Sequence, residues 1–162
     1  MDEMNQIETL NTFVHHRLCV QTSLQKIVHE LERRQLIHDE SKFRADEFEG
    51  FSRINAIARQ YKYGSQQYRD ALKKEKPTIK LHFSRNPHHP EYHASPDEMG
   101  LFDLIEMVCD WYAAYQVYES AKPLDQRVSW RESMQVNRDR FTEFTDGQWF
   151  VINHISDYLV DT

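Results

Sequence analysis

Cysteine, glycine and proline are all scarce in this chain of 162 residues, which has two cysteines, four glycines and five prolines. Cys19 and Cys109 are far apart and form no Cys-x-x-Cys motif, so the sequence predicts neither a disulfide framework nor a thiolate zinc site. Any bound metal would therefore need nitrogen and oxygen ligands. Because helix-breaking residues are few and β-branched residues do not alternate with polar ones over a long stretch, helices are favoured.

The chain also lacks an excess of basic charge and a long apolar run. A net charge of −6 argues against a protein that follows a nucleic-acid backbone, whose affinity comes mainly from Lys and Arg. This net charge does not exclude a small phosphorylated substrate. The chain begins with acidic and polar residues, and no apolar run approaches a membrane span, so we expect a cytosolic protein without membrane association. Length and composition predict a single domain over residues 1–162.

Apolar residues recur at steps of three and four along much of the chain, which predicts an all-α protein of about six or seven helices. The expected helices span residues 10–31, 44–61, 66–74, 99–120, 129–136 and 146–159. Thr145 or Asp146 is expected to cap the last helix. Four of the five prolines lie between Pro77 and Pro96, so the part after Arg85 is predicted to be an ordered loop.

Histidine is abundant, and part of it is concentrated in that loop. Four of the nine histidines fall within twelve residues, namely His82, His88, His89 and His93. Imidazoles this close repel one another when protonated, and a bound metal would keep them neutral. A solvated, histidine-rich loop is the competing interpretation. Pro87 and Pro90 favour a loop of fixed geometry.

Two further groups could supply ligands. His38 and Asp39 are adjacent, so both can face one ion only at a helix end, because successive helical residues are turned by about 100°. A helix cap with a surface histidine is the simpler interpretation of that pair. On the helix expected at 99–120, Asp103, Glu106 and Asp110 lie along one side. Asp110 stands among apolar residues, and a buried carboxylate needs a partner or a metal.

A helix histidine, a His-Asp pair and a late helix aspartate together resemble the arrangement in the HD superfamily of metal-dependent phosphohydrolases. The resemblance implies an HD-like helical bundle. The first histidine would be His16, with His15 and His29 as alternatives. His16 lies 22 residues before His38, roughly 33 Å along an unbroken helix. The chain must therefore turn back after about Leu31 for both to share an ion.

A narrower resemblance covers most of the chain. Its three blocks are similar to those of an uncharacterised family encoded largely by bacteriophages, and they occur in the expected order: His38-Asp39-x-Ser41-Lys42-Phe43 followed by Glu47, Asn86-x-His88-His89-Pro90-Glu91-Tyr92, and Asp103-Leu104-x-Glu106-Met107-x-x-Asp110-Trp111. HD relatives often carry a glutamate shortly after the His-Asp pair. Ser41 and Lys42 stand there in this chain, so the resemblance supplies no general acid.

These resemblances imply a metal-dependent phosphohydrolase that acts on a nucleotide or another small phosphate ester. One or two divalent ions would be held by His16, His38, Asp39 and Asp110. His82, His88 and His89 would complete a second ion or bind the phosphate. A nitrogen and oxygen ligand set suits Mn, Fe, Co, Ni or Zn.

Three other residues receive roles in this hypothesis. Lys42 and Arg85 would offset the charge that grows on phosphate oxygens, although both could be plain surface cations. Glu106 would orient a histidine ligand. The alternative function is a non-catalytic, metal-stabilised protein that docks on a host protein through an aromatic surface formed by Tyr61, Tyr63, Tyr68, Trp130 and Trp149.

Overall fold

The computed structural model describes residues 3–161 and contains, within them, seven α-helices, five short 3-10 helices and no strand. The prediction of an all-α protein with about six or seven helices and an ordered histidine-rich loop is confirmed. The α-helices are α1 (Glu3–Ile37), α2 (Ala45–Gln60), α3 (Gln66–Leu72), α4 (Lys76–Phe83), α5 (Leu101–Ser120), α6 (Trp130–Arg140) and α7 (Asp146–Asp161), and the 3-10 helices are η1 (Glu40–Phe43), η2 (Lys73–Glu75), η3 (Pro90–Tyr92), η4 (Pro96–Glu98) and η5 (Leu124–Gln126). None of these helices is both long and apolar enough to cross a membrane.

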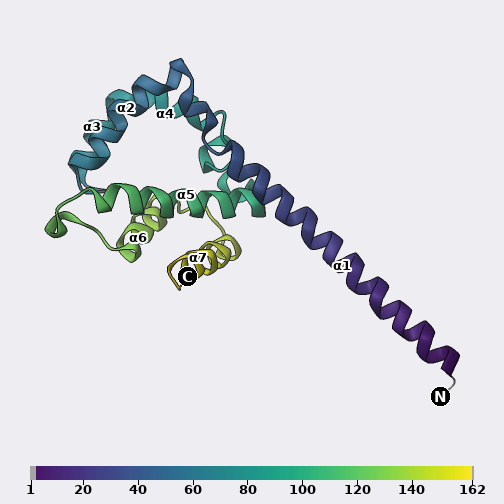
Figure 1. The fold of residues 1–162 in the computed structure, drawn as a ribbon. Helices are drawn as coiled ribbons and strands as arrows, with labels where there is room; N and C mark the ends of the chain where they lie inside the picture. Colours follow the sequence, from purple (N-terminus) through teal and green to yellow (C-terminus); the bar gives the residue numbers. More distant parts are fainter. Residues whose placement is uncertain (1–2, 162) are drawn as a thin grey trace. The chain divides into compact units, whose positions relative to one another are not determined.

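The contacts divide the chain into two compact units, the first ending at His38 and the second beginning at Asp39. Helix α1 forms the first unit and runs unbroken to Ile37 (Figure 1). The turn expected after Leu31 is absent, because no glycine or proline occurs before Gly50. Glu30 also pairs with Arg33 and Arg34, each at 2.8 Å, across the place where the turn was expected.

The second unit has its apolar core between α5 and α7. Met107, Val108 and Ile152 are completely buried there, and each such side chain contributes about 1.5–3 kcal/mol relative to an exposed one. Trp111 of α5 stacks on Phe141 with ring centroids 5.7 Å apart. This packing holds α5 in place, and α5 carries Glu106 and Asp110.

Side chains at the helix starts satisfy backbone groups that the helices leave open. Ser129 accepts a hydrogen bond from the Glu132 backbone amide, and the Glu132 carboxylate accepts one from the Ser129 amide. Thr145 and Gln148 make the same reciprocal pair at the start of α7. Of the two residues proposed to cap α7, Thr145 is therefore the cap.

Helix α4 was not expected from the sequence, although Pro77 is compatible with it. The proline occupies the first turn of α4, where its missing N–H is not needed. The helix lies very close to α2, because a Cβ atom added at Gly50 would stand 2.1 Å from the Thr78 hydroxyl oxygen. Only glycine fits at this contact, which brings Glu47 of α2 against His82 of α4.

Candidate metal centre

Asp39, the first residue of the second unit, adopts a left-handed backbone conformation with φ 56° and ψ 18°. Aspartate tolerates this region better than most residues, because its short polar side chain can bond locally. The Asp39 carbonyl accepts a 2.9 Å hydrogen bond from the Lys42 amide, which starts η1. The Asp39 side chain is only 12% exposed, and its Oδ2 pairs with the Lys42 ammonium group.

His82 on α4 is held by a carboxylate on one side and faces Asp39 on the other. Its Nδ1 lies 3.0 Å from Oε2 of Glu47, and its Nε2 lies 3.1 Å from Oδ1 of Asp39. Because an ionised Glu47 can only accept, the Nδ1 atom carries the hydrogen and the Nε2 lone pair points at Asp39. Two acceptors facing each other at this distance repel unless a proton or a metal ion lies between them.

Glu47 itself is fully buried and is fixed by three polar neighbours. The Ser41 hydroxyl donates to it at 2.9 Å, and Arg85 donates at 2.6 Å. Burial raises the pKa of the Glu47 carboxyl, but the bonds from Arg85, Ser41 and His82 outweigh it, so that the pKa is lower than usual. The carboxylate is therefore charged when it orients His82.

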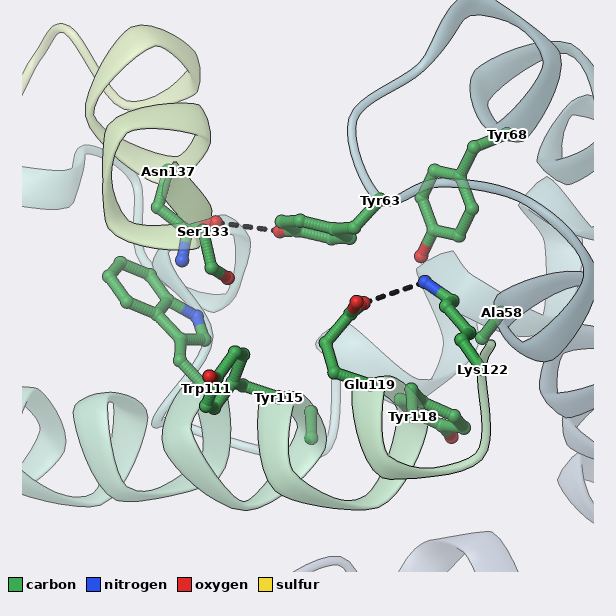
Figure 2. Close-up of a pocket in the computed structure, with 11 residues that line it drawn as sticks. Ala58, Tyr63, Tyr68, Trp111, Tyr115, Tyr118, Glu119, Lys122, Ser133 and Asn137 are labelled. Atoms are coloured by element: carbon green, nitrogen blue, oxygen red, sulfur yellow. Dashed lines mark hydrogen bonds and ion pairs between the residues drawn. The ribbon is translucent and has the colours of Figure 1, made fainter. Parts of the chain in front are cut away.

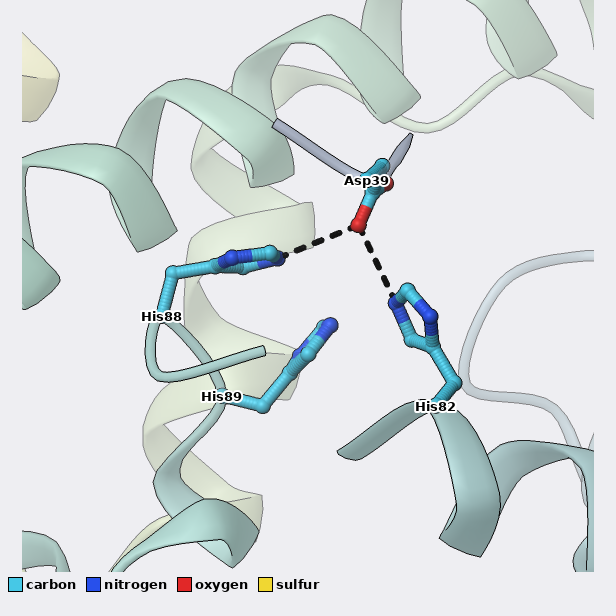
Figure 3. Close-up of side chains that lie close together, drawn as sticks. All are labelled: Asp39, His82, His88 and His89. Atoms are coloured by element: carbon cyan, nitrogen blue, oxygen red, sulfur yellow. Dashed lines mark ion pairs between the residues drawn. The ribbon is translucent and has the colours of Figure 1, made fainter. Parts of the chain in front are cut away.

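His88 and His89 come from the loop that follows α4. The Asn86 side chain donates to the His82 carbonyl at 2.8 Å, and the Asn86 carbonyl accepts from the His89 amide at 3.1 Å. His93 closes the loop with a 2.8 Å bond to the Pro87 carbonyl. The expected ordered loop is thus fixed by hydrogen bonds from its own side chains and backbone, and His88 and His89 are turned inward (Figure 3).

His88 repeats the arrangement seen at His82. Its Nδ1 lies 3.2 Å from Oε1 of Glu106, and its Nε2 lies 3.5 Å from Oδ1 of Asp39. The predicted role of Glu106, orienting a histidine ligand, agrees with this contact. Two imidazoles are therefore each backed by a carboxylate while their other nitrogen faces the same aspartate oxygen.

His89 completes the group, and Figure 3 shows its ring between those of His82 and His88. Burial, together with the neighbouring charges of His88 and His82, lowers the pKa of His89 to about 2. The ring is therefore neutral at ordinary pH. The buried Nε2 atoms of His82 and His89 make no hydrogen bond within the described residues.

A divalent ion fits this group of atoms. One ligand atom from each of Asp39, His82, His88 and His89 lies within 4.8 Å of all the others. Bonds of about 2.1 Å around a tetrahedral ion would separate the ligands by about 3.4 Å, and the two aspartate contacts measure 3.1 and 3.5 Å. Three imidazoles and one carboxylate suit a transition metal such as Zn or Mn better than Mg.

The remaining predicted metal ligands are Asp110, His38 and His16. Asp110 has a carboxylate oxygen within 4.8 Å of an Asp39 oxygen. His38 is the half-buried last residue of the first unit. His16 is exposed on α1, and the unbroken helix separates it from His38 by roughly 33 Å. The prediction that His16 and His38 of one chain share an ion is therefore wrong.

Arg85 also differs from its predicted role. Its guanidinium group binds Asp46 at 2.7 Å and Glu47 at 2.6 Å, and these two carboxylates raise its pKa above the usual value. Arg85 thus contacts the carboxylate behind His82. Its contacts make it a positioning residue for Glu47, and they give no support to phosphate binding.

A cavity of about 720 Å³ adjoins the histidine group, and His82 and His89 form part of its wall. Apolar and aromatic residues line much of it, including Phe51, Ile54, Tyr68 and Phe83. Its charged lining has one acid, Asp139, and five cations, namely Lys42, Arg69, Lys73, Lys76 and Arg140. The cavity therefore combines flat apolar surface with cations, of which Lys42, Lys73 and Arg140 are paired with Asp39, Asp70 and Glu91.

A second cavity of about 100 Å³ lies between α5 and α6 (Figure 2). Its wall contains a buried ion pair, in which Lys122 donates to Glu119 at 2.6 Å. Glu119 also accepts from the Val128 backbone amide at 2.8 Å, and Tyr63 donates to Asn137 at 2.7 Å. These polar groups satisfy one another, so this cavity has the character of a packed structural network.

The family comparison agrees with the sequence blocks. Residues 5–148 match the model of a family of unknown function, DUF5662. The chain belongs to that family, which confirms the predicted membership of an uncharacterised family. No curated protein and no solved structure matched the chain significantly.

Proposed function

We propose that this protein is a metal-dependent phosphohydrolase that acts on a nucleotide or another small phosphate ester. The observation that carries the proposal is the position of His82 and His89, which belong both to the ligand group and to the wall of the 720 Å³ cavity. A substrate in that cavity would have its phosphate beside the ion. We propose the cytosol as the compartment, since such substrates are found there.

The chain's own residues suit such a substrate. Asp39, His82, His88 and His89 would hold a divalent ion, which when bound lowers the pKa of a water molecule and polarises a phosphate oxygen. The ammonium group of Lys76, which lines the cavity, would bind a phosphate oxygen. Phe51 and Tyr68 offer flat surfaces on which a nucleobase can stack.

Glu47 and Glu106 have a supporting role in this proposal. Each would keep the proton of its histidine on Nδ1, so that Nε2 remains free to bind the ion. Ser41 donates to Glu47 and so is already engaged. We assign no general acid, in line with the missing glutamate after the His-Asp pair. The relationship to the HD superfamily and an origin in bacteriophages stay part of the proposal and rest on the sequence blocks.

A structural metal in a non-catalytic protein is the second candidate. Four protein ligands are enough to complete the coordination of a tetrahedral ion, whereas catalytic zinc sites keep one coordination position for water. The proposed aromatic docking surface finds less support, because Trp149 is only 7% exposed and Trp130 donates to Ser156 inside the unit. Tyr61, Tyr63 and Tyr68 are all half-buried.

Turnover and metal content together distinguish the two candidates. The full-length protein is loaded with Mn²⁺ or with Zn²⁺ and incubated with nucleoside mono-, di- and triphosphates, and products are followed by chromatography and mass spectrometry. The phosphohydrolase proposal expects product with the loaded protein and with His154→Ala, whose histidine is exposed on α7. It expects neither bound metal nor product with His82→Ala. Tight metal binding without any turnover would contradict it and favour the structural role.

A second pair of variants tests the cavity. Lys76 lines it, and Lys80 lies one turn later on the same helix and is exposed. Because a bond from a charged donor contributes about 1.5–3 kcal/mol, Lys76→Ala should raise KM by about 10-fold or more and leave metal content unchanged. Lys80→Ala should change neither. Equal KM values for the two variants would place the substrate elsewhere.

A further inference from the structure

Helix α1 carries a long apolar stripe that its own unit cannot cover. No residue of α1 is buried, and the large apolar residues between Ile7 and Val28 are 44–65% exposed. Soluble monomers rarely leave so long an apolar surface in water. The helix has 35 residues and is therefore about 52 Å long. A partner of matching length is needed to cover it.

The stripe follows a heptad repeat over four heptads. The first core column contains Ile7, Val14, Gln21 and Val28, the second contains Leu10, Arg17, Leu24 and Leu31, and a flanking column contains Phe13, Val20 and Ile27. Such a repeat over this length is typical of a coiled coil. The face turned away from it is polar, and His15, His16 and His29 lie there.

The two polar core positions indicate which partner completes the stripe. Two copies of α1 can run antiparallel with their Cys19 residues at the same level. Each core residue then faces the residue of the second copy for which the two residue numbers sum to 38. Ile7 then meets Leu31, Val14 meets Leu24, and Val28 meets Leu10. Gln21 meets Arg17, so both polar residues are paired with each other.

The flanking positions fit the same register. Val20 lies within about 3 Å, along the axis, of Val20 of the second copy, and Phe13 lies at the same offset from Ile27. A parallel pair would instead place Arg17 against Arg17, which brings two like charges together in the core. The polar layer thus selects the antiparallel orientation, as buried polar residues do in other coiled coils.

The helix dipoles act in the same direction. An antiparallel pair sets the positive end of each α1 dipole beside the negative end of the other. We infer that the protein forms a homodimer through an antiparallel coiled coil of two α1 helices.

Cross-linking tests the orientation directly. Val14→Cys and Leu24→Cys are each made in the full chain with Cys19→Ser and Cys109→Ser, and the proteins are treated with a short bifunctional maleimide. In the antiparallel pair, the two copies of residue 14 lie about 15 Å apart along the axis, and so do the two copies of residue 24. Val14 of one copy instead faces Leu24 of the other. Covalent dimers are therefore expected only when the two proteins are mixed. A dimer from either protein alone would show a parallel pair, and no dimer in any sample would show that something else covers the stripe.

A second experiment measures the dimer itself. Leu24→Glu places a charge in the core of the coiled coil, whereas Thr22→Glu places the same charge on the outer face. Sedimentation equilibrium should show a dimer for the unchanged chain and for Thr22→Glu, and a dissociation constant raised roughly 100-fold or more for Leu24→Glu. Circular dichroism and metal binding check that all three are folded. The inference would be overturned if the unchanged chain were still monomeric at a protein concentration 100 times that needed for the sedimentation measurement.

Discussion

Replacing Glu106 by glutamine should weaken metal binding without removing any ligand. The Glu106 carboxylate lies 3.2 Å from Nδ1 of His88 and is only 14% exposed. Glutamine has the same size but no charge, so it holds the His88 proton less firmly and lowers the basicity of Nε2. Loss of such a supporting carboxylate typically costs about 10–100-fold in metal affinity, or about 1.4–2.7 kcal/mol.

The same change has a measurable effect on unfolding. At a metal concentration about 100 times the dissociation constant, the ion stabilises the unchanged protein by about 2.7 kcal/mol. A protein of this size gains roughly 2–4 °C in Tm for each kcal/mol, so the metal should raise Tm by about 5–11 °C. With Glu106→Gln the gain should fall to about 1–6 °C at the same metal concentration.

Titration calorimetry of metal-free protein with Mn²⁺ and with Zn²⁺ gives the affinities, and scanning calorimetry gives the Tm values. Glu98→Gln is the matched control, since Glu98 is an exposed acid in η4. The control should bind metal like the unchanged chain. If Glu106→Gln also binds it with unchanged affinity, the assigned role of Glu106 is wrong.

Three further predictions concern stability. Lys122→Met should destabilise the protein by about 3–5 kcal/mol in urea unfolding, because it leaves the Glu119 carboxylate buried without its cation; a loss below 1 kcal/mol would contradict this. Gly50→Ala should cost about 1–3 kcal/mol and weaken metal binding, because the new methyl group pushes α2 away from α4; Thr78→Ala should restore part of both losses. Metal-free protein should lose stability as the pH falls below about 6.5, because the unfolded chain protonates His89 while the folded chain, with its lowered pKa, does not. His89→Gln should flatten this pH dependence, and an unchanged slope would show another origin.

The helices with a clear apolar period were predictable from the sequence. The expected helix at 99–120 is α5 (Leu101–Ser120), and the expected helix at 44–61 is α2 (Ala45–Gln60). The prediction of a turn after Leu31 was wrong. It was made only so that His16 and His38 could share an ion, and no glycine or proline lies there to form a turn. Helix α4 was missed because the loop was predicted only after Arg85 and no helix was assigned to the residues just before it, although proline is well tolerated in a first helical turn.

The candidate site was predictable to the extent that its ligands were of distinctive types. Asp39, His88 and His89 stood out because they occur in dense His and carboxylate blocks. Glu47 is 35 residues from its histidine partner His82, and no local pattern links the two. The close packing at Gly50 joins them, and this packing depends on tertiary structure. For the same reason the carboxylate contact of Arg85 could not be read from the sequence.

The central claim is that Asp39, His82, His88 and His89 hold one divalent ion. Crystals of the full-length protein grown with Zn²⁺ and measured at the zinc absorption edge test it most directly. We predict a strong anomalous peak about 2.0–2.2 Å from Oδ1 of Asp39 and from the three Nε2 atoms. Zinc bound only at other residues, with these four side chains unchanged and unligated, would contradict the claim.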